Sequence, residues 1–176
     1  MQNSSSPYPT PTVKRRLITM LYESLLLLAV EALAMFVYLF VTRNQHTPFI
    51  DHGRNALFFL VAAAYFIHFW TDSGHTLAMK TWRIKVVKVG YAKLPWRAAA
   101  VRYMMAWGWF LPALAVCHLF GIKDKSQVGI AIALGIVAWA LTAFLDKDRQ
   151  FLHDRVAGTR LISLPKVKLG KAAAKE

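Results

Sequence analysis

Residues 16–41 read RLITMLYESLLLLAVEALAMFVYLFV, an apolar run that decides the fold of the chain. As an α-helix, this run is about 39 Å long at 1.5 Å per residue, which exceeds the thickness of a bilayer hydrocarbon core, about 30 Å. The run contains Glu23 and Glu31. A charged carboxylate at such a depth costs about 2.5–3.5 kcal/mol unless protein, water or a proton accommodates it. The run therefore predicts a transmembrane helix whose carboxyl groups face away from lipid.

The spacing of the charged residues in this helix predicts where they lie. Arg16 and Glu23 are two helical turns apart, so their side chains share one face, with the carboxyl group about 10 Å deeper than the guanidinium. Glu31 lies about 12 Å deeper again, near the middle of the membrane. All three are expected to face the protein interior or water.

The composition also indicates a membrane protein. The chain has 176 residues, of which 56% are hydrophobic, yet its formal net charge is +13. The basic residues alternate with apolar segments and form no single basic module, which argues against a nucleic acid partner. The single cysteine, Cys117, excludes an intrachain disulfide. The polar start MQNSSSPYPTPT is unlike a cleavable signal peptide, so we expect the first span to remain as an anchor.

Three further apolar segments predict three further spans, at residues 56–70, 98–120 and 128–145. The first of these has only fifteen residues, so it either extends through its polar neighbours or crosses a thinned bilayer. The second contains Pro112, which is expected to bend it. The fold class is therefore an all-α membrane protein with four transmembrane helices.

The segment between the second and third spans, residues 71–97, is polar and carries six basic residues. Within it, WRIKVVKVG is rich in β-branched residues and ends at a glycine, so it is either a short strand or a basic amphipathic piece on the headgroups. We favour the strand, and expect it to pair with GTRLISL at residues 158–164 as a small cytoplasmic β element.

Lysine and arginine positions predict the topology. Three precede the first span, six lie in residues 71–97 and eight follow the fourth span, whereas the other two connections hold four together. Basic residues favour the cytoplasmic side, so both termini are expected there. We expect a disordered tail at residues 1–13, one transmembrane domain at 14–164 and a basic disordered tail at 165–176.

Four charged side chains are predicted to form a cluster at the cytoplasmic end of the bundle: Arg16, Glu23, Arg102 and Asp154. Glu23 and Arg102 lie at similar depths in their helices, which predicts an ion pair between them, and a second pair between Arg16 and Asp154. One interpretation is that these pairs only hold the helices together. The other is that Glu23 or Glu31 binds a proton or a cation, because an intramembrane carboxyl can exchange one for the other.

The sequence offers little sign of catalysis. It has no nucleophile with a base and an orienting group, and no glycine-rich phosphate loop. His68 and His118 are expected to pack or to lie at the interface, and Cys117 and His118 point about 100° apart on a helix. We therefore expect no enzyme activity, no metal site and no cofactor.

Several of these residues give the chain a resemblance to the RDD family of small bacterial membrane proteins, named for one arginine and two aspartates. The family's arginine at the start of the first helix matches Arg16, and its first aspartate falls on Glu23, which keeps the carboxyl but adds a methylene. The second aspartate matches Asp154 in FLHDRVAGTRLI, and an arginine early in the third span matches Arg102.

The resemblance extends from Lys14 to Leu164. A family loop motif similar to G-Q-T-P-G-K appears here as GHTLAMK, from Gly74 to Lys80. The resemblance implies a bacterial inner-membrane protein. Family members are mostly of unknown function, with transport suggested in general and cation/proton antiport proposed for some.

Two functions follow as hypotheses. In the first, the protein is a transporter or antiporter subunit that moves a cation or small solute against protons, with Glu23 and Glu31 as carriers and Arg102 tuning them. A narrow four-helix bundle would then need an oligomer interface or a membrane partner, with Glu31 or small residues of the fourth span lining the path. Those small residues, which serve equally for close packing, are Gly129, Ala131, Ala133 and Gly135.

In the second hypothesis, the protein is a non-transporting module whose basic cytoplasmic face binds a protein partner or anionic lipid. The residues expected to form that face are Lys80, Arg83, Lys85 and Lys88.

Overall fold

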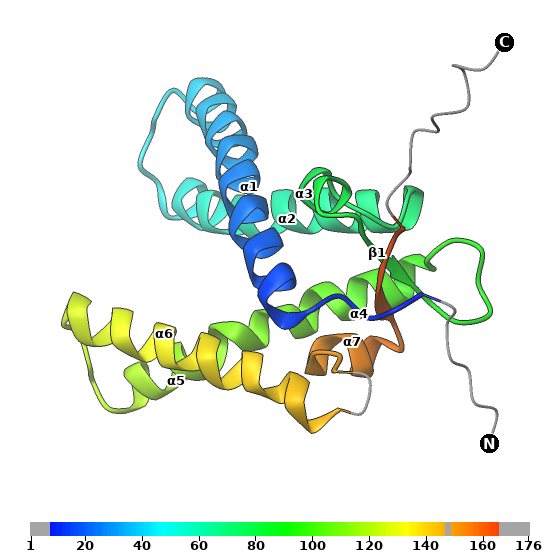
Figure 1. Cartoon of the computed structure of the whole chain (residues 1–176). Coiled ribbons are helices and arrows are strands. Elements are labelled where there is room, and N and C mark those ends of the chain that lie inside the picture. The colour runs from blue at the N-terminus through cyan, green and yellow to red at the C-terminus, as the bar shows by residue number, and fades with distance from the viewer. Residues whose placement is uncertain (1–7, 147–148, 166–176) are drawn as a thin grey trace, which may run out of the picture.

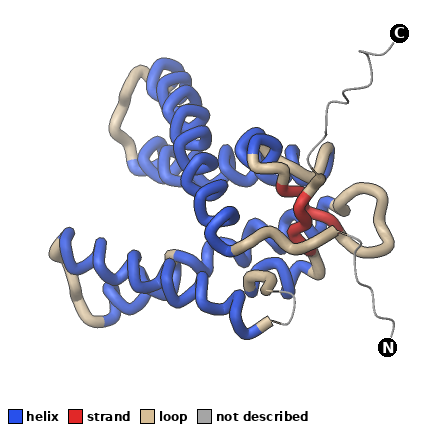
Figure 2. Tube along the Cα trace, viewed as in Figure 1, coloured by secondary structure: helices blue, strands red, loops and turns tan. Residues whose placement is uncertain are grey.

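A computed structural model of the protein describes residues 8–146 and 149–165 (Figure 1). The elements follow in the order α1 (Val13–Val41), α2 (Pro48–Asp72), α3 (Leu77–Thr81), β1 (Ile84–Val87), α4 (Trp96–Ala106), the 3-10 turn η1 (Trp107–Trp109), α5 (Leu111–Leu119), α6 (Lys125–Leu141), the 3-10 turn η2 (Thr142–Leu145), α7 (Leu152–Ala157) and β2 (Arg160–Ser163). Figure 2 shows the two strands gathered at one end of an otherwise helical molecule, which we call the strand end.

Three helices of the described residues are long and apolar enough to cross a bilayer: α1, α2 and the continuous stretch Lys125–Leu145. A fourth span forms if Trp96–Trp109 and Leu111–Leu119 are counted as one, bent by 44° at the break between them. The predicted all-α membrane fold is confirmed. The short second span does extend through its polar neighbours, since α2 has 25 residues.

The bend in the third span comes from its sequence. Pro112 occupies the first turn of α5, where its missing N–H cannot continue a hydrogen-bond ladder from α4. Gly108 lies just before the break, and a Cβ there would come within 2.2 Å of the Trp139 ring on α6. Proline and glycine together therefore bend the chain and allow α6 to approach it closely.

The expected β element is confirmed. β1 and β2 pair antiparallel, with Ile84 opposite Ser163 and Val87 opposite Arg160. Burial alternates along β1: Ile84 and Val86 are buried, whereas Lys85 and Val87 are half-buried. The Val86 N–H also donates to the Gly74 carbonyl over 2.7 Å, which ties the start of the loop motif to the strand.

The N-terminal tail differs from expectation at its inner end. Residues 1–7 lie outside the described residues, as do the last eleven residues of the predicted C-terminal tail, 166–176. The Pro9 carbonyl, however, accepts a 2.8 Å hydrogen bond from the Ser163 N–H, and the Thr10 hydroxyl accepts one from the Gln150 amide. Thr12 then caps α1. The backbone before α1 is thus ordered because it finds hydrogen-bond partners beside β2.

The helices form two hairpins that meet near the strand end (Figure 1). α1 packs on α2 and α5 packs on α6, while α4 packs on both α2 and α7. The α1–α2 and α5–α6 connections both lie at the end of the molecule away from the strands. Buried apolar side chains concentrate near the strand end, around Trp70, Ile84, Ala99 and Tyr103. The outward faces of the long helices remain apolar and exposed, as lipid-facing surfaces must be.

Candidate functional site

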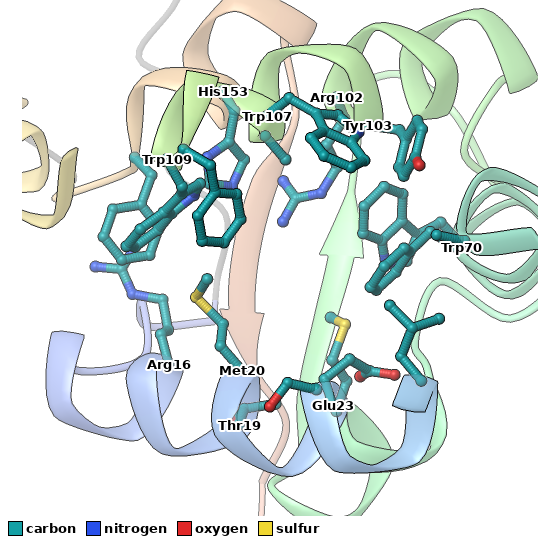
Figure 3. A pocket seen from close by; sticks show the side chains of 18 of the residues that line it. Arg16, Thr19, Met20, Glu23, Trp70, Arg102, Tyr103, Trp107, Trp109 and His153 are labelled. Atoms are coloured by element: carbon teal, nitrogen blue, oxygen red, sulfur yellow. The ribbon is translucent and has the colours of Figure 1, made fainter. Parts of the chain in front are cut away.

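A cavity of about 410 Å³ lies between α1, α2, α4, η1 and α7. Its walls are mostly apolar and aromatic, and five of its side chains can carry a charge: Arg16, Glu23, Glu31, Arg102 and His153. Figure 3 shows Arg16 and Glu23 rising from α1 on one side, with Arg102 and His153 facing them from the other. Helices far apart in sequence thus bring the predicted charged residues to one site, although not in the predicted pairs.

Arg102 forms an ion pair with Asp154, not with Glu23. Its guanidinium Nη1 contacts Asp154 Oδ1 and also donates to the Thr159 hydroxyl over 3.3 Å. Asp154 is wholly buried and Arg102 is nearly so. The predicted Glu23–Arg102 pair is therefore wrong. The reason is that the short helix α7 packs against α4 and places Asp154 directly on the arginine.

Arg16 has no carboxylate bonded to it among the described residues, so the predicted Arg16–Asp154 pair is also wrong. Its Nη2 donates to the Arg149 carbonyl over 2.5 Å, and its guanidinium lies 4.2 Å from the centre of the Phe151 ring. The side chain is 2% exposed, and its Nε and Nη1 atoms find no acceptor in the described part of the chain. Arg16 thus connects α1 to the segment before α7 through a backbone carbonyl and a ring face.

Glu23 is held by two hydroxyl groups. The Tyr65 hydroxyl on α2 donates to Glu23 Oε1 over 2.6 Å, and the Thr76 hydroxyl donates to Oε2. Thr76 also caps α3, accepting from the Met79 N–H. The sequence reasoning assigned no role to Tyr65 or Thr76. A signal existed only for Thr76, because it is the threonine of the GHTLAMK motif.

Glu31 lies two turns beyond Glu23 and also lines the cavity, where its side chain is half-buried. It has no ion-pair or hydrogen-bond partner among the described residues. Both carboxyl groups therefore border one cavity at different depths of the same helix.

His153 is a further residue of the site that the sequence reasoning did not identify. It is buried, and its Nδ1 accepts a 3.2 Å hydrogen bond from the Trp139 indole N–H. Its Nε2 lies 3.6 Å from Asp154 Oδ2. Burial, together with the positive charges of Arg102 and Arg16, lowers the pKa of His153 well below its ordinary value. The imidazole is therefore neutral at pH 7.

The predicted basic face is only partly open. Lys80 and Arg83 are exposed at the strand end, but Lys85 and Lys88 are half-buried. A Cβ at Gly74 would meet Lys85 at 2.8 Å, and the Lys88 ammonium lies 5.5 Å from the Tyr91 ring centre. Two of the four basic residues thus make local contacts on the protein surface.

Of the small residues predicted to line a path or to pack closely on α6, only some are packed within the chain. A Cβ at Gly135 would approach the Ala113 Cβ and the Trp109 carbonyl at 3.2 Å, so this glycine serves close packing within the chain. A Cβ at Gly129 would meet nothing within 4 Å. Ala131 is half-buried and Ala133 is exposed.

Comparison with known proteins adds one finding. The family model of the RDD family matches residues 10–158, which include all four residues of the predicted charge cluster. Neither the curated proteins nor the solved structures give a significant match.

Proposed function

The chain belongs to the RDD family and is a multi-pass membrane protein, and from this premise we propose that it exchanges protons for a cation or small solute across a bacterial cytoplasmic membrane. Glu23 is the carboxyl group that exchanges a proton for the transported species, and Glu31 is a second binding position on the same path. The role is binding and transport, not catalysis.

The observation that carries this proposal is the environment of Glu23. Glu23 is 7% exposed, belongs to a helix long and apolar enough to span a membrane, and borders the cavity. Its partners in the described part of the chain are the uncharged Tyr65 and Thr76 hydroxyls. A carboxylate at such a depth is costly unless a proton or a cation neutralises it. Because no arginine or lysine supplies that charge from these residues, an exchangeable ion can.

The ion pair between Arg102 and Asp154 supports this role. Asp154 compensates the charge of Arg102, which Figure 3 shows across the cavity from Glu23. An arginine bound directly to Glu23 would compete with any cation for the carboxylate. The structure instead leaves Glu23 with hydroxyl oxygens, each of which can donate to a carboxylate or turn a lone pair towards a cation. A proton leaving Glu23 can thus be replaced by a cation at the same oxygens.

Glu31 supplies the next position along α1. It lies about 12 Å from Glu23 along the helix axis and borders the same cavity. We place both termini and the strand end in the cytoplasm, because basic residues concentrate there and the two hairpin connections lie at the opposite end. The path then leads from the cytoplasmic end towards mid-membrane, and an interface with a second copy or a membrane partner completes it.

The test is proton-coupled cation flux in sealed proteoliposomes containing the purified protein, with sodium, potassium and lithium in turn. Glu23→Gln should abolish exchange while the protein stays folded, because the amide keeps the shape but cannot release a proton. Glu31→Gln should reduce exchange. Asp72→Asn is the matched control, since Asp72 is exposed and pairs with Lys93 at the end of α2. Flux that persists in Glu23→Gln at the wild-type rate would overturn the assignment.

The alternative function is a non-transporting module that binds a protein partner or anionic lipid through its basic face. The exposure of Lys80 and Arg83 favours it. In that case the wild type would show no flux in sealed vesicles, and Lys80→Gln with Arg83→Gln would weaken binding to vesicles that contain anionic lipid. Wild-type flux together with unchanged vesicle binding in this double variant would count against the alternative.

A further inference from the structure

The cavity has an excess of hydrogen-bond donors at one end. Arg16 Nε and Nη1, Arg102 Nε and the Trp109 indole N–H are buried and have no acceptor among the described residues. All three side chains border the cavity and are at most 5% exposed. Buried donors normally find an acceptor, because an unsatisfied one costs about 1–3 kcal/mol, and more when it is charged. Four such donors in three neighbouring side chains indicate a bound acceptor.

The charges around these donors favour an anion. Arg16 and Arg102 carry positive charge, and Asp154 compensates Arg102. Asp146 attracts Arg16 but is shared with Arg155, whose Nε lies 3.5 Å from its Oδ1, and with the Gln150 N–H. His153 is neutral. Among the described residues, two buried arginines thus line this end of the cavity and no carboxylate is bonded to Arg16, while Glu23 lies farther along α1, held by its hydroxyl partners.

The rest of the cavity would suit an apolar chain. Beyond these donors the wall is mostly apolar and aromatic, with Leu27, Phe66 and Trp107 among its members. Its polar groups there are the side chains of Thr19, Glu23, Ser24 and Glu31 and the indole N–H of Trp70. Met20, Phe58 and Phe110 also line it and are 38–42% exposed. Met20 and Phe58 lie on the long apolar helices α1 and α2, and Phe110 lies at the break between η1 and α5, so the cavity opens on an apolar surface. A ligand that reaches it from the bilayer must itself carry an apolar part.

We propose that this cavity binds a membrane amphiphile with one anionic head group, a carboxylate or phosphate monoester, and a single hydrocarbon chain. The head group accepts from Arg16, Arg102 and Trp109, and the chain lies along the aromatic wall towards Phe58. A volume near 410 Å³ is at the lower end for small-molecule sites, which favours one chain over two. Guanidinium groups suit both head groups because they donate in a planar fork.

The proposal is independent of proton exchange at Glu23, although both use the same cavity. Binding should persist in Glu23→Gln even where flux is lost. Wild-type flux in Glu23→Gln would therefore contradict proton exchange alone, whereas absence of amphiphile binding to the wild type would contradict the binding proposal alone.

The experiment measures binding to the full-length protein in nanodiscs of zwitterionic lipid, by tryptophan quenching with a brominated fatty acid and by native mass spectrometry. Competing ligands are dodecanoate, dodecyl phosphate, inorganic phosphate and dodecyltrimethylammonium. We expect the two anionic amphiphiles to displace the probe. Displacement by inorganic phosphate at the same concentration would show that the ligand needs no hydrocarbon chain and would contradict the proposal. Equal displacement by the cationic amphiphile would overturn the anionic head group.

Two variants test the head-group end and one tests the chain. Trp109→Phe keeps a ring and removes one donor, and Arg16→Gln removes the charge, so each should weaken binding about tenfold, measured for Trp109→Phe by native mass spectrometry because the substitution also removes a tryptophan of the cavity. Because Arg16→Gln also loses the bond to the Arg149 carbonyl and can fail to fold, Trp109→Phe keeps the test decisive. Ser24→Phe should block the chain from the rim of the cavity. Its matched control is Leu134→Phe, at a position 65% exposed on α6. Wild-type affinity in both Trp109→Phe and Ser24→Phe would overturn the proposal.

Discussion

The Thr76 hydroxyl donates a hydrogen bond to Glu23 Oε2, which joins the GHTLAMK loop motif directly to the first transmembrane helix. Thr76 is 1% exposed and also caps α3 through its hydroxyl oxygen. One hydroxyl group therefore satisfies both a buried carboxyl group and a helix N-terminus.

Replacing this hydroxyl should destabilise the protein. Thr76→Val keeps the shape of the side chain but leaves one Glu23 oxygen without a donor and α3 without its cap. We expect a loss of about 1–3 kcal/mol in the free energy of unfolding. Thermal unfolding in detergent, followed by circular dichroism, measures it. Thr76→Ser keeps the hydroxyl and serves as the control, and equal stabilities of the two variants would contradict the prediction.

Breaking the ion pair between Arg102 and Asp154 should destabilise the folded protein far more than breaking an exposed ion pair. Asp154→Asn leaves Arg102 charged in a buried site, at a cost of about 3–5 kcal/mol. The exposed pair between Asp72 and Lys93 provides the comparison, and Asp72→Asn should cost about 0–1 kcal/mol. The yield of folded protein and its melting temperature distinguish the two. Similar melting temperatures for both variants would show that the buried pair has little structural role.

Alanine substitutions at Gly74 and Gly90 should distinguish the cost of backbone strain from the cost of a steric clash. Gly74 and Gly90 have φ values of +78° and +82°, so an alanine at either position is strained. At Gly74 the new Cβ would also lie 2.8 Å from the Val86 carbonyl oxygen, whereas at Gly90 it would meet nothing within 4 Å. Gly74→Ala should therefore lower the melting temperature more than Gly90→Ala. An equal decrease would mean that φ alone sets the cost.

His153 should make the protein less stable in mild acid. Its native pKa lies well below 6.5, because of burial and then the charges of Arg102 and Arg16. The unfolded chain takes up a proton near pH 6.5 while the native state does not, so the stability present above that pH is lost as the pH falls below it. His153→Asn should reduce this dependence between pH 7.5 and 5, measured by melting temperature. The exposed His118→Asn is the matched substitution, and an unchanged slope in His153→Asn would refute the assignment.

Much of the fold follows from local sequence. The length of the run at residues 16–41 requires a span, and Pro112 marks the bend between α4 and α5. The β-branched stretch around Val86 forms a strand and pairs with the segment predicted for it. The span, the bend and the strand each depend on residues that are close together in the sequence. Hydropathy, proline geometry and side-chain branching therefore predict them without knowledge of distant segments.

The sequence by itself determined that the protein spans a membrane and that Arg16, Glu23 and Arg102 lie in one cluster, because depth in a helix follows from residue count. Only the tertiary structure decided which charges pair. Residue count leaves open the rotation of each helix about its axis and the docking of α7 on α4. Those two features place Asp154 on Arg102, leave Glu23 to the Tyr65 and Thr76 hydroxyls, and direct the remaining donors of Arg16 towards the cavity.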